Sequence, residues 1–116
     1  MTEQRANDFA NRWISAWNTN RFEDVLGFYA DDFTWSSSCR SIHEDLQGTL
    51  KGKEAVRRYW QKTRSRCDAM HAQLVEVKNT DESITIYYRT GETTFIADVL
   101  FLNDAGKVAK AVTLCK

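Results

Sequence analysis

Residues 69–115, AMHAQLVEVKNTDESITIYYRTGETTFIADVLFLNDAGKVAKAVTLC, are the stretch that decides the fold. Apolar and polar side chains alternate along it, as they do in strands that bury one face of a sheet. We expect four strands, at about 69–79, 82–90, 93–103 and 107–115. The segments between them are rich in Asn, Asp, Gly and Thr, which favour turns, so consecutive strands should pair antiparallel as a meander.

The chain before this stretch is mainly helical in pattern. Apolar residues recur every three or four positions up to Asn18–Asn20, which predicts an amphipathic first helix that ends there. A shorter helix is expected over about 22–32 and a third over about 53–68. Between them, apolar and polar residues alternate over 33–37, which predicts a short strand.

Helices that come before a strand meander predict an α+β fold, in which helices cover one face of an antiparallel sheet. The length of 116 residues fits a single domain spanning 1–116. Residues 36–51 are polar and are expected to form a long loop or a ragged hairpin. Long loops in compact domains often serve a functional site.

Charge, hydropathy and cysteine count limit the kinds of partner and the cellular location that we expect. The chain has 16 Lys or Arg and 16 Asp or Glu, so its formal net charge is zero, and we expect no nucleic acid partner. No apolar run approaches the ~20 residues of a membrane span, and no basic amphipathic stretch is present, so we expect no membrane partner. The polar N-terminus predicts no signal peptide. Three cysteines, an odd number, favour reduced thiols and a cytoplasmic location; they are Cys39, Cys67 and Cys115.

Asp98 is the strongest candidate for a functional residue. It lies in FIADVLFL (residues 95–102), which otherwise has the pattern of a buried strand. A buried carboxyl loses hydration, so it pairs or stays protonated, and such groups gather at sites of acid–base chemistry. We expect Asp98 to act as a general base or as a neutral donor to an oxyanion. The alternatives are a salt bridge to Arg89 or Lys110 across the sheet, and a charge in a dimer interface.

The four tryptophans could line a pocket for a flat ligand or fill the core. Trp17 follows Trp13 at helical spacing and is expected in the core. For Trp13, Trp35 and Trp60 the choice between pocket lining and core packing stays open. Each indole N–H needs a hydrogen-bond partner if it is buried.

The histidines and the paired tyrosines give weaker signals. His71 begins the first long strand and is either a second acid–base group at a pocket mouth or an exposed strand end. His43 lies in a polar segment, and neither histidine has metal-ligand spacing, so we expect no metal. Tyr87 and Tyr88 are adjacent on a strand and must face opposite ways, but the alternation does not show which one faces inward.

Four motifs, taken in order, carry a resemblance to a known family. They are WISAWN (13–18), FYADDF (28–33), LKGKEAV (50–56) and NDAGKV (103–108). Together they resemble the SnoaL-like group of the nuclear-transport-factor-2-like superfamily over nearly the whole chain. The resemblance implies a cone, in which a curved antiparallel or mixed sheet and the three helices enclose a pocket. It also implies a homodimer through the outer face of the sheet.

The superfamily includes ketosteroid isomerases, polyketide cyclases, dehydratases, epoxide hydrolases and proteins that only bind or dock. By resemblance, Asp98 matches the isomerase's oxyanion-hole aspartate, and Tyr29 matches a supporting tyrosine. Trp13 and Trp60 stand where the isomerase has two further tyrosines. Its general-base aspartate falls at about Ser37, so that base is missing. Cyclases of the superfamily use one late-strand aspartate as a base, which leaves that chemistry open for this chain.

The leading hypothesis is a cofactor-independent acid–base enzyme of the isomerase, cyclase, dehydratase or hydrolase type, with Asp98 as its catalytic residue. Its substrate would be a small apolar molecule, cyclic or carbonyl-bearing, bound by Trp13, Tyr29, Trp35, Trp60 and His71. The first alternative is a non-catalytic small-molecule-binding protein, which fits the missing base. The second is a dimeric structural or docking module. In that case an apolar outer sheet face would be buried between subunits: Ala97, Val99, Phe101, Val112 and Leu114.

Overall fold

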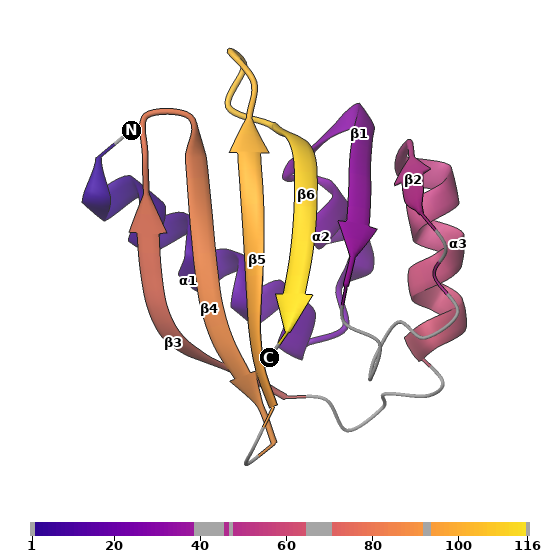
Figure 1. Cartoon of the computed structure of the whole chain (residues 1–116), viewed down its shortest axis with the longest axis horizontal. Helices are drawn as coiled ribbons and strands as arrows, with labels where there is room; N and C mark the ends of the chain where they lie inside the picture. The colour runs from indigo at the N-terminus through magenta and orange to yellow at the C-terminus, as the bar shows by residue number, and fades with distance from the viewer. Residues whose placement is uncertain (1, 39–45, 47, 65–70, 92–93, 116) are drawn as a thin grey trace.

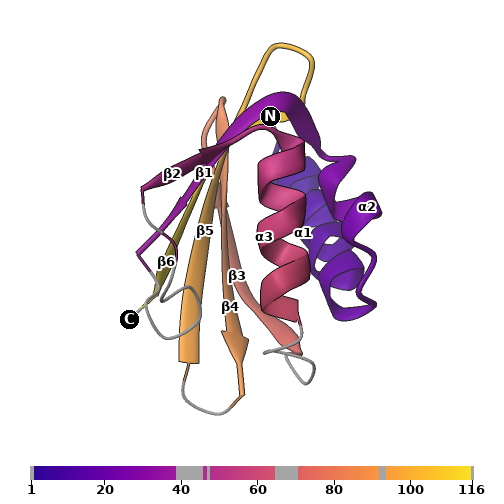
Figure 2. The ribbon, with the colours of Figure 1, turned by 90° about the vertical axis from the view of Figure 1, so that its right-hand side faces the viewer.

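Helices cover one face of a curved six-stranded sheet in the computed structural model of the chain (Figures 1 and 2). The structure describes residues 2–38, 46, 48–64, 71–91 and 94–115. Its elements are α1 (Glu3–Asn18), α2 (Phe22–Leu26), β1 (Tyr29–Ser37), β2 (Thr49–Lys51), α3 (Lys53–Arg64), β3 (Ala72–Asn79), β4 (Ser83–Thr90), β5 (Thr94–Leu102) and β6 (Val108–Cys115).

The sheet is mixed, with strand order β2-β1-β6-β5-β4-β3. Strands β3 to β6 form the expected antiparallel meander, and their bounds lie within three residues of the predicted ones. β1 joins the meander by pairing parallel with β6, and β2 then pairs antiparallel with β1. The sheet does not close into a barrel, which confirms the expected α+β class with a curved mixed sheet.

α1 forms where the 3.6-residue pattern predicts it. The Thr2 hydroxyl caps its start by accepting from the backbone N–H of Arg5 at 3.2 Å. At its other end, the Asn18 side chain donates to the Ala72 carbonyl at 2.8 Å and accepts from the Ala72 N–H at 2.7 Å. These two bonds fix the end of α1 to the start of β3. Asn20 follows in the left-handed region, with φ of 57°, which Asn tolerates well.

The two faces of the sheet differ in burial. Alternate residues of β4, β5 and β6 face the helices and are buried: Ile84, Ile86, Tyr88, Ile96, Asp98, Leu100, Ala111 and Thr113. On the opposite face of the sheet, no helix of the described residues lies over the strands, and we call it the open face (Figure 2). It leaves large apolar side chains exposed, among them Phe95, Phe101 and Leu114.

The expected second helix ends earlier than predicted. α2 stops at Leu26, and residues 29–32 belong to β1 instead of a helix. The cause is a long-range pairing, because Tyr29 lies opposite Val108 of β6 and the Val108 N–H donates to the Phe28 carbonyl at 2.9 Å. Sheet pairing therefore overrides the local helical pattern here.

The remaining predicted segments fall partly outside the described residues. The 36–51 segment contains the short strand β2, while residues 39–45 and 47 lie outside the described part of the chain, as do His43 and Cys39. α3 is described as far as Arg64, so its predicted end at 66–68 also lies outside.

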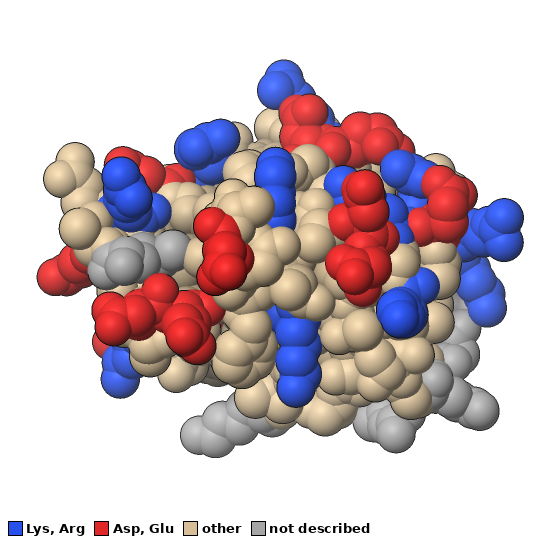
Figure 3. Space-filling model, turned by 90° about the horizontal axis from the view of Figure 1, so that it is seen from above, with Lys and Arg blue, Asp and Glu red and all other residues tan. Residues whose placement is uncertain are grey.

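Cys115 is disulfide-bonded, so the expectation of reduced thiols is wrong at this position. The cytoplasmic location rested on reduced thiols, and that support no longer holds. Among the described residues, no helix is both long and apolar enough to span a membrane. The face seen from above carries Lys and Arg side chains interspersed with Asp and Glu, in keeping with the balanced composition (Figure 3).

The Asn18 contacts give a prediction about stability. Asn18→Ala removes two hydrogen bonds to the Ala72 backbone and should lower the free energy of unfolding by roughly 1–3 kcal/mol in chemical denaturation. Asn11→Ala is the control, because the Asn11 amide bonds only to the exposed carbonyl of Asn7 in its own helix. Equal losses in the two variants would contradict the role given to Asn18.

Candidate functional site

Asp98 occupies the middle of β5 on the helix-covered face and is 5% exposed. Its neighbours across the sheet are Ile86 on β4 and Thr113 on β6. The Tyr88 hydroxyl donates to Asp98 Oδ2 at 2.6 Å, and the Thr113 hydroxyl donates to Oδ1 at 2.5 Å. Both carboxyl oxygens therefore accept a hydrogen bond from an uncharged donor.

Neither cation that the sequence offered as a partner pairs with Asp98. Arg89 lies on the open face, opposite Phe95, and donates to the Gln73 amide oxygen at 2.5 Å. Lys110 is also on the open face, with its ammonium 5.5 Å from the centroid of the Phe101 ring. Among the described residues, Asp98 has no cationic partner, so the salt-bridge alternative is wrong.

Burial without a cation changes the pKa of Asp98. Loss of hydration raises the pKa from 3.8 to about 6, and the hydrogen bonds from Thr113 and Tyr88 act in the opposite direction. Burial also raises the pKa of Tyr29 and of Tyr88, and the nearby charge of Asp98 adds to both shifts. Both phenols therefore stay protonated and act as hydrogen-bond donors at neutral pH.

Two buried indoles hold the polar groups around Asp98 in place. The Trp35 N–H donates to the Thr113 hydroxyl oxygen at 2.9 Å, which directs the Thr113 proton toward Asp98. The Trp13 N–H donates to the Tyr29 hydroxyl oxygen at 3.0 Å. Among the described residues, the Tyr29 proton itself has no acceptor, so Tyr29 remains able to donate to another molecule.

Trp60 joins these groups into one aromatic cluster. Its ring centroid lies 4.7 Å from that of Trp17, 6.1 Å from that of Tyr29 and 6.0 Å from that of Trp35. Trp13 lies 5.7 Å from Tyr88 on the same measure, which connects the cluster to the partner of Asp98. The structure thus brings together five of the six predicted site residues: Trp13, Tyr29, Trp35, Trp60 and Asp98.

His71 is the predicted site residue that does not join the cluster. It is exposed, immediately before β3, and makes none of the contacts described above. Within the described residues, no group of three His, Cys, Asp or Glu side chains is arranged to hold a metal ion.

Three residues around Asp98 and Trp60 were not among the predicted site residues: Tyr88, left undecided against Tyr87, Thr113, and Trp17, placed in the core. Tyr88, and not Tyr87, faces inward, and Thr113 was not considered at all. Both depend on the register between strands, in which Asp98 lies opposite Thr113 and Tyr88 lies opposite Ile96. Trp17, expected in the core, has a buried N–H that finds no hydrogen-bond partner among the described residues. The helical spacing of Trp17 gives no sign that its N–H would lack a partner.

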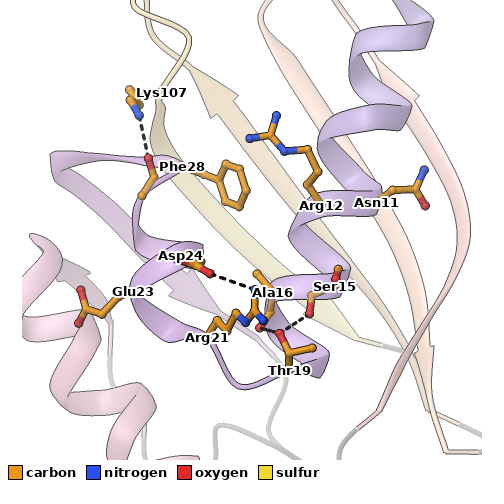
Figure 4. A pocket seen from close by; sticks show the side chains of 11 residues that line it. Asn11, Arg12, Ser15, Ala16, Thr19, Arg21, Glu23, Asp24, Phe28 and Lys107 are labelled. Atoms are coloured by element: carbon orange, nitrogen blue, oxygen red, sulfur yellow. Dashed lines mark hydrogen bonds and ion pairs between the residues drawn. The ribbon is translucent and has the colours of Figure 1, made fainter.

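Two hollows lined by described residues lie away from Asp98. One is a groove of about 390 Å³ on the open face of the sheet, beside Phe95 and Leu114. The other is a groove of about 650 Å³ on the helix side, between α1 and α2 (Figure 4).

A curved mixed sheet, with helices over the face that buries Asp98, defines a nuclear-transport-factor-2-like α+β protein. The family model of the SnoaL-like domain matches residues 10–111, and the chain belongs to this family. Comparison with curated proteins gives no match.

Solved structures share this fold over almost the whole chain. A SnoaL-like protein of unknown function from Burkholderia thailandensis has a TM-score of 0.89 at 28% identity, covering 100% of this chain and 98% of that one. TerC, co-crystallised with polyporic acid, has a TM-score of 0.78 at 14% identity, with coverage of 96% and 92%. SalBIII is an epoxide hydrolase/cyclase-like enzyme with a role in pyran ring formation in the polyether salinomycin. Its TM-score is 0.76 at 12% identity, with coverage of 98% and 92%.

The pKa of Asp98 gives a prediction about stability and pH. The folded pKa, about 6, lies above the ordinary 3.8, so the folded protein holds the proton more tightly than the unfolded chain does. This contribution to stability is full below pH 3.8 and is lost as the pH rises to about 6, roughly 3 kcal/mol in all.

Denaturant unfolding of wild type and Asp98→Asn between pH 4 and 8 measures this contribution. In wild type, the unfolding free energy should fall as the pH rises from 4 to 8, and the part due to Asp98 should be absent in Asp98→Asn. Asp81→Asn, which removes an exposed turn carboxylate, should keep this pH dependence. Identical pH dependence in wild type and Asp98→Asn would show that the Asp98 carboxyl is not perturbed.

Proposed function

We propose that the chain is a cofactor-independent acid–base enzyme in which Asp98 removes a proton from a small apolar molecule. The substrate is cyclic or carbonyl-bearing and binds against the aromatic cluster around Trp60. The observation that carries the proposal is a buried carboxyl with two hydroxyl donors and no cation among the described residues. Such a group is poorly explained by stability alone, because burial of an uncompensated charge is unfavourable.

The hydrogen bonds favour a base over a neutral donor. Tyr88 and Thr113 both donate to Asp98, so both oxygens already act as acceptors, and the carboxylate form suits this arrangement. With a pKa of about 6, most of the group is ionised at pH 7 yet remains basic enough to take a proton. A general base works best when its pKa is close to the working pH.

Tyr29 is suited to the complementary role. Removal of a proton next to a carbonyl places negative charge on the carbonyl oxygen, which a positioned donor stabilises. Tyr29 accepts from Trp13, which strengthens its own O–H as a donor, and that proton has no acceptor among the described residues. We assign Tyr29 to the developing oxyanion.

Trp17 supports a ligand that carries a further oxygen. Its buried N–H has no partner in the described part of the chain, and a buried donor left unpaired is unfavourable by about 1–3 kcal/mol. A carbonyl or hydroxyl oxygen of the ligand would satisfy it. The structures of similar fold include an epoxide hydrolase/cyclase-like enzyme and a protein crystallised with polyporic acid, which agrees with an oxygen-bearing cyclic ligand.

A non-catalytic binding protein is the second candidate. It is favoured by the internal hydrogen bonds of Asp98, since a carboxylate with both oxygens occupied also serves as a fixed part of a pocket wall. It predicts the same ligands without turnover.

The enzyme proposal predicts a loss of turnover in Asp98→Asn. Cyclic ketones and enones are first screened by the increase they cause in melting temperature, and the hits are then assayed for conversion. Turnover should fall roughly 10²–10⁴-fold in Asp98→Asn, and in wild type it should rise with pH around an apparent pKa of about 6.

Thr113→Ser, which keeps the hydroxyl beside Asp98, is the matched control and should retain most of the activity. Unchanged turnover in Asp98→Asn would remove Asp98 from the mechanism. Ligand-induced stabilisation without conversion of any hit would support the binding protein instead.

We also propose that the chain forms a homodimer through the open face of the sheet. Phe95, Phe101 and Leu114 are 47%, 39% and 44% exposed and share this uncovered face with Val99. Val75 is 56% exposed and lines the same groove as Phe95 and Leu114. Exposed apolar side chains gathered on one face mark an interaction surface, and a two-fold axis would place this face against its own copy.

Leu114→Glu places a charge in this apolar surface and should convert the dimer into a monomer in sedimentation velocity. Gln61→Glu adds the same charge to the exposed side of α3 and should leave the dimer intact. A wild-type monomer at micromolar concentration, or a Leu114→Glu dimer, would contradict this interface.

A further inference from the structure

The groove between α1 and α2 has an arrangement of charge that the proposed function does not use. It has a volume of about 650 Å³ and is bounded by one side of α1, by the chain from Arg21 to Phe28, and by Lys107 before β6. Figure 4 shows Arg12 and Lys107 on either side of Phe28, with Ser15, Thr19 and Asp24 further along the groove. Asp98 lines no part of it.

The two cations beside Phe28 have no anionic partner among the described residues. The Arg12 guanidinium lies 5.4 Å from the centroid of the Phe28 ring, which orders it without neutralising it. The Lys107 ammonium donates to the Gly27 carbonyl at 2.7 Å, which fixes its position at the groove edge and leaves its charge and two further donors available.

The acidic residues of the groove are already occupied. Glu23 binds Arg57 of α3 through both of its oxygens, at 2.7 and 3.1 Å. Asp24 lies 3.9 Å from Arg21. After these pairs are counted, Arg12 and Lys107 remain as two uncompensated positive charges at one end. The chain has no net charge, so this excess arises from the fold and not from composition.

We propose that this groove is a second ligand site, which binds a phosphate monoester of a small hydroxylated molecule. A phosphate monoester carries a charge of about −2 at pH 7, which matches the two free cations. The planar guanidinium of Arg12 offers parallel donors to two phosphate oxygens, and Lys107 adds a point charge. The hydroxyl oxygens of Ser15 and Thr19 offer acceptors to the hydroxyl groups of the bound molecule. The proposal is independent of the chemistry at Asp98.

The test uses glycerol 3-phosphate, with inorganic phosphate, glycerol and sodium sulfate at matched ionic strength as comparisons. Titrations followed by ¹H–¹⁵N chemical shifts should show saturable binding of glycerol 3-phosphate, with the shifts concentrated at Arg12, Ser15, Phe28 and Lys107. Arg12→Gln and Lys107→Gln should each weaken binding about tenfold. Arg58→Gln removes an exposed cation of α3 outside the groove and should leave binding unchanged.

Three results would overturn the proposal. The first is the absence of saturable shifts, and the second is an equal loss of affinity in Arg58→Gln, which would show a diffuse charge effect. The third is that inorganic phosphate or sulfate binds as tightly as glycerol 3-phosphate, because the glycerol part of the ligand would then contribute nothing to the affinity. Melting curves of each variant confirm that the fold is intact before binding is compared.

Discussion

The burial of the Asp98 carboxyl between two hydroxyl donors is the constraint on which the rest of the site depends. A carboxylate removed from water needs either a cation or several hydrogen bonds, and from the residues that the structure describes Asp98 receives two, from Tyr88 and Thr113. The balance leaves its pKa at about 6, between full ionisation and full protonation at neutral pH. The same loss of hydration keeps the phenols of Tyr29 and Tyr88 protonated. The interior therefore contains a proton acceptor, Asp98, beside two hydroxyl donors.

The sheet topology explains how distant segments supply this interior. β1 lies between β2 and β6, so Tyr29 at its start and Trp35 near its end stand beside the strand that carries Thr113. α1 and α3 then bring Trp13 and Trp60 over the same face. The Trp13 and Trp35 indoles donate to hydroxyl groups of the site, and Trp60 packs against Trp35. The aromatic cluster therefore both positions the hydroxyl donors and excludes water.

Most of the fold could be predicted from local pattern, because β4 and most of β5 alternate between buried and partly exposed residues and the turns of the meander contain Asn, Asp, Gly and Thr. The failures are long-range. Residues 29–32 have a helical pattern but pair with β6, and the choice of Tyr88 over Tyr87 requires the register between β4 and β5. Asp98 was found because a charge in an apolar strand is a local anomaly. Its partner Thr113 resembles any other strand threonine, and the disulfide at Cys115 left no local sign.

The parallel pairing of β1 with β6 has a consequence for how the chain reaches this state. Trp35 and Thr113, which hydrogen-bond across that pairing, are 78 positions apart in sequence. Closing so long a loop is entropically unfavourable, and contacts of this kind slow folding. During synthesis the hairpin of β4 and β5 can form early, but the centre of the sheet forms only after β6 has emerged. Until β6 docks, the Asp98 carboxyl lacks the hydrogen bond from Thr113, so its buried environment is complete only after β5 and β6 have paired.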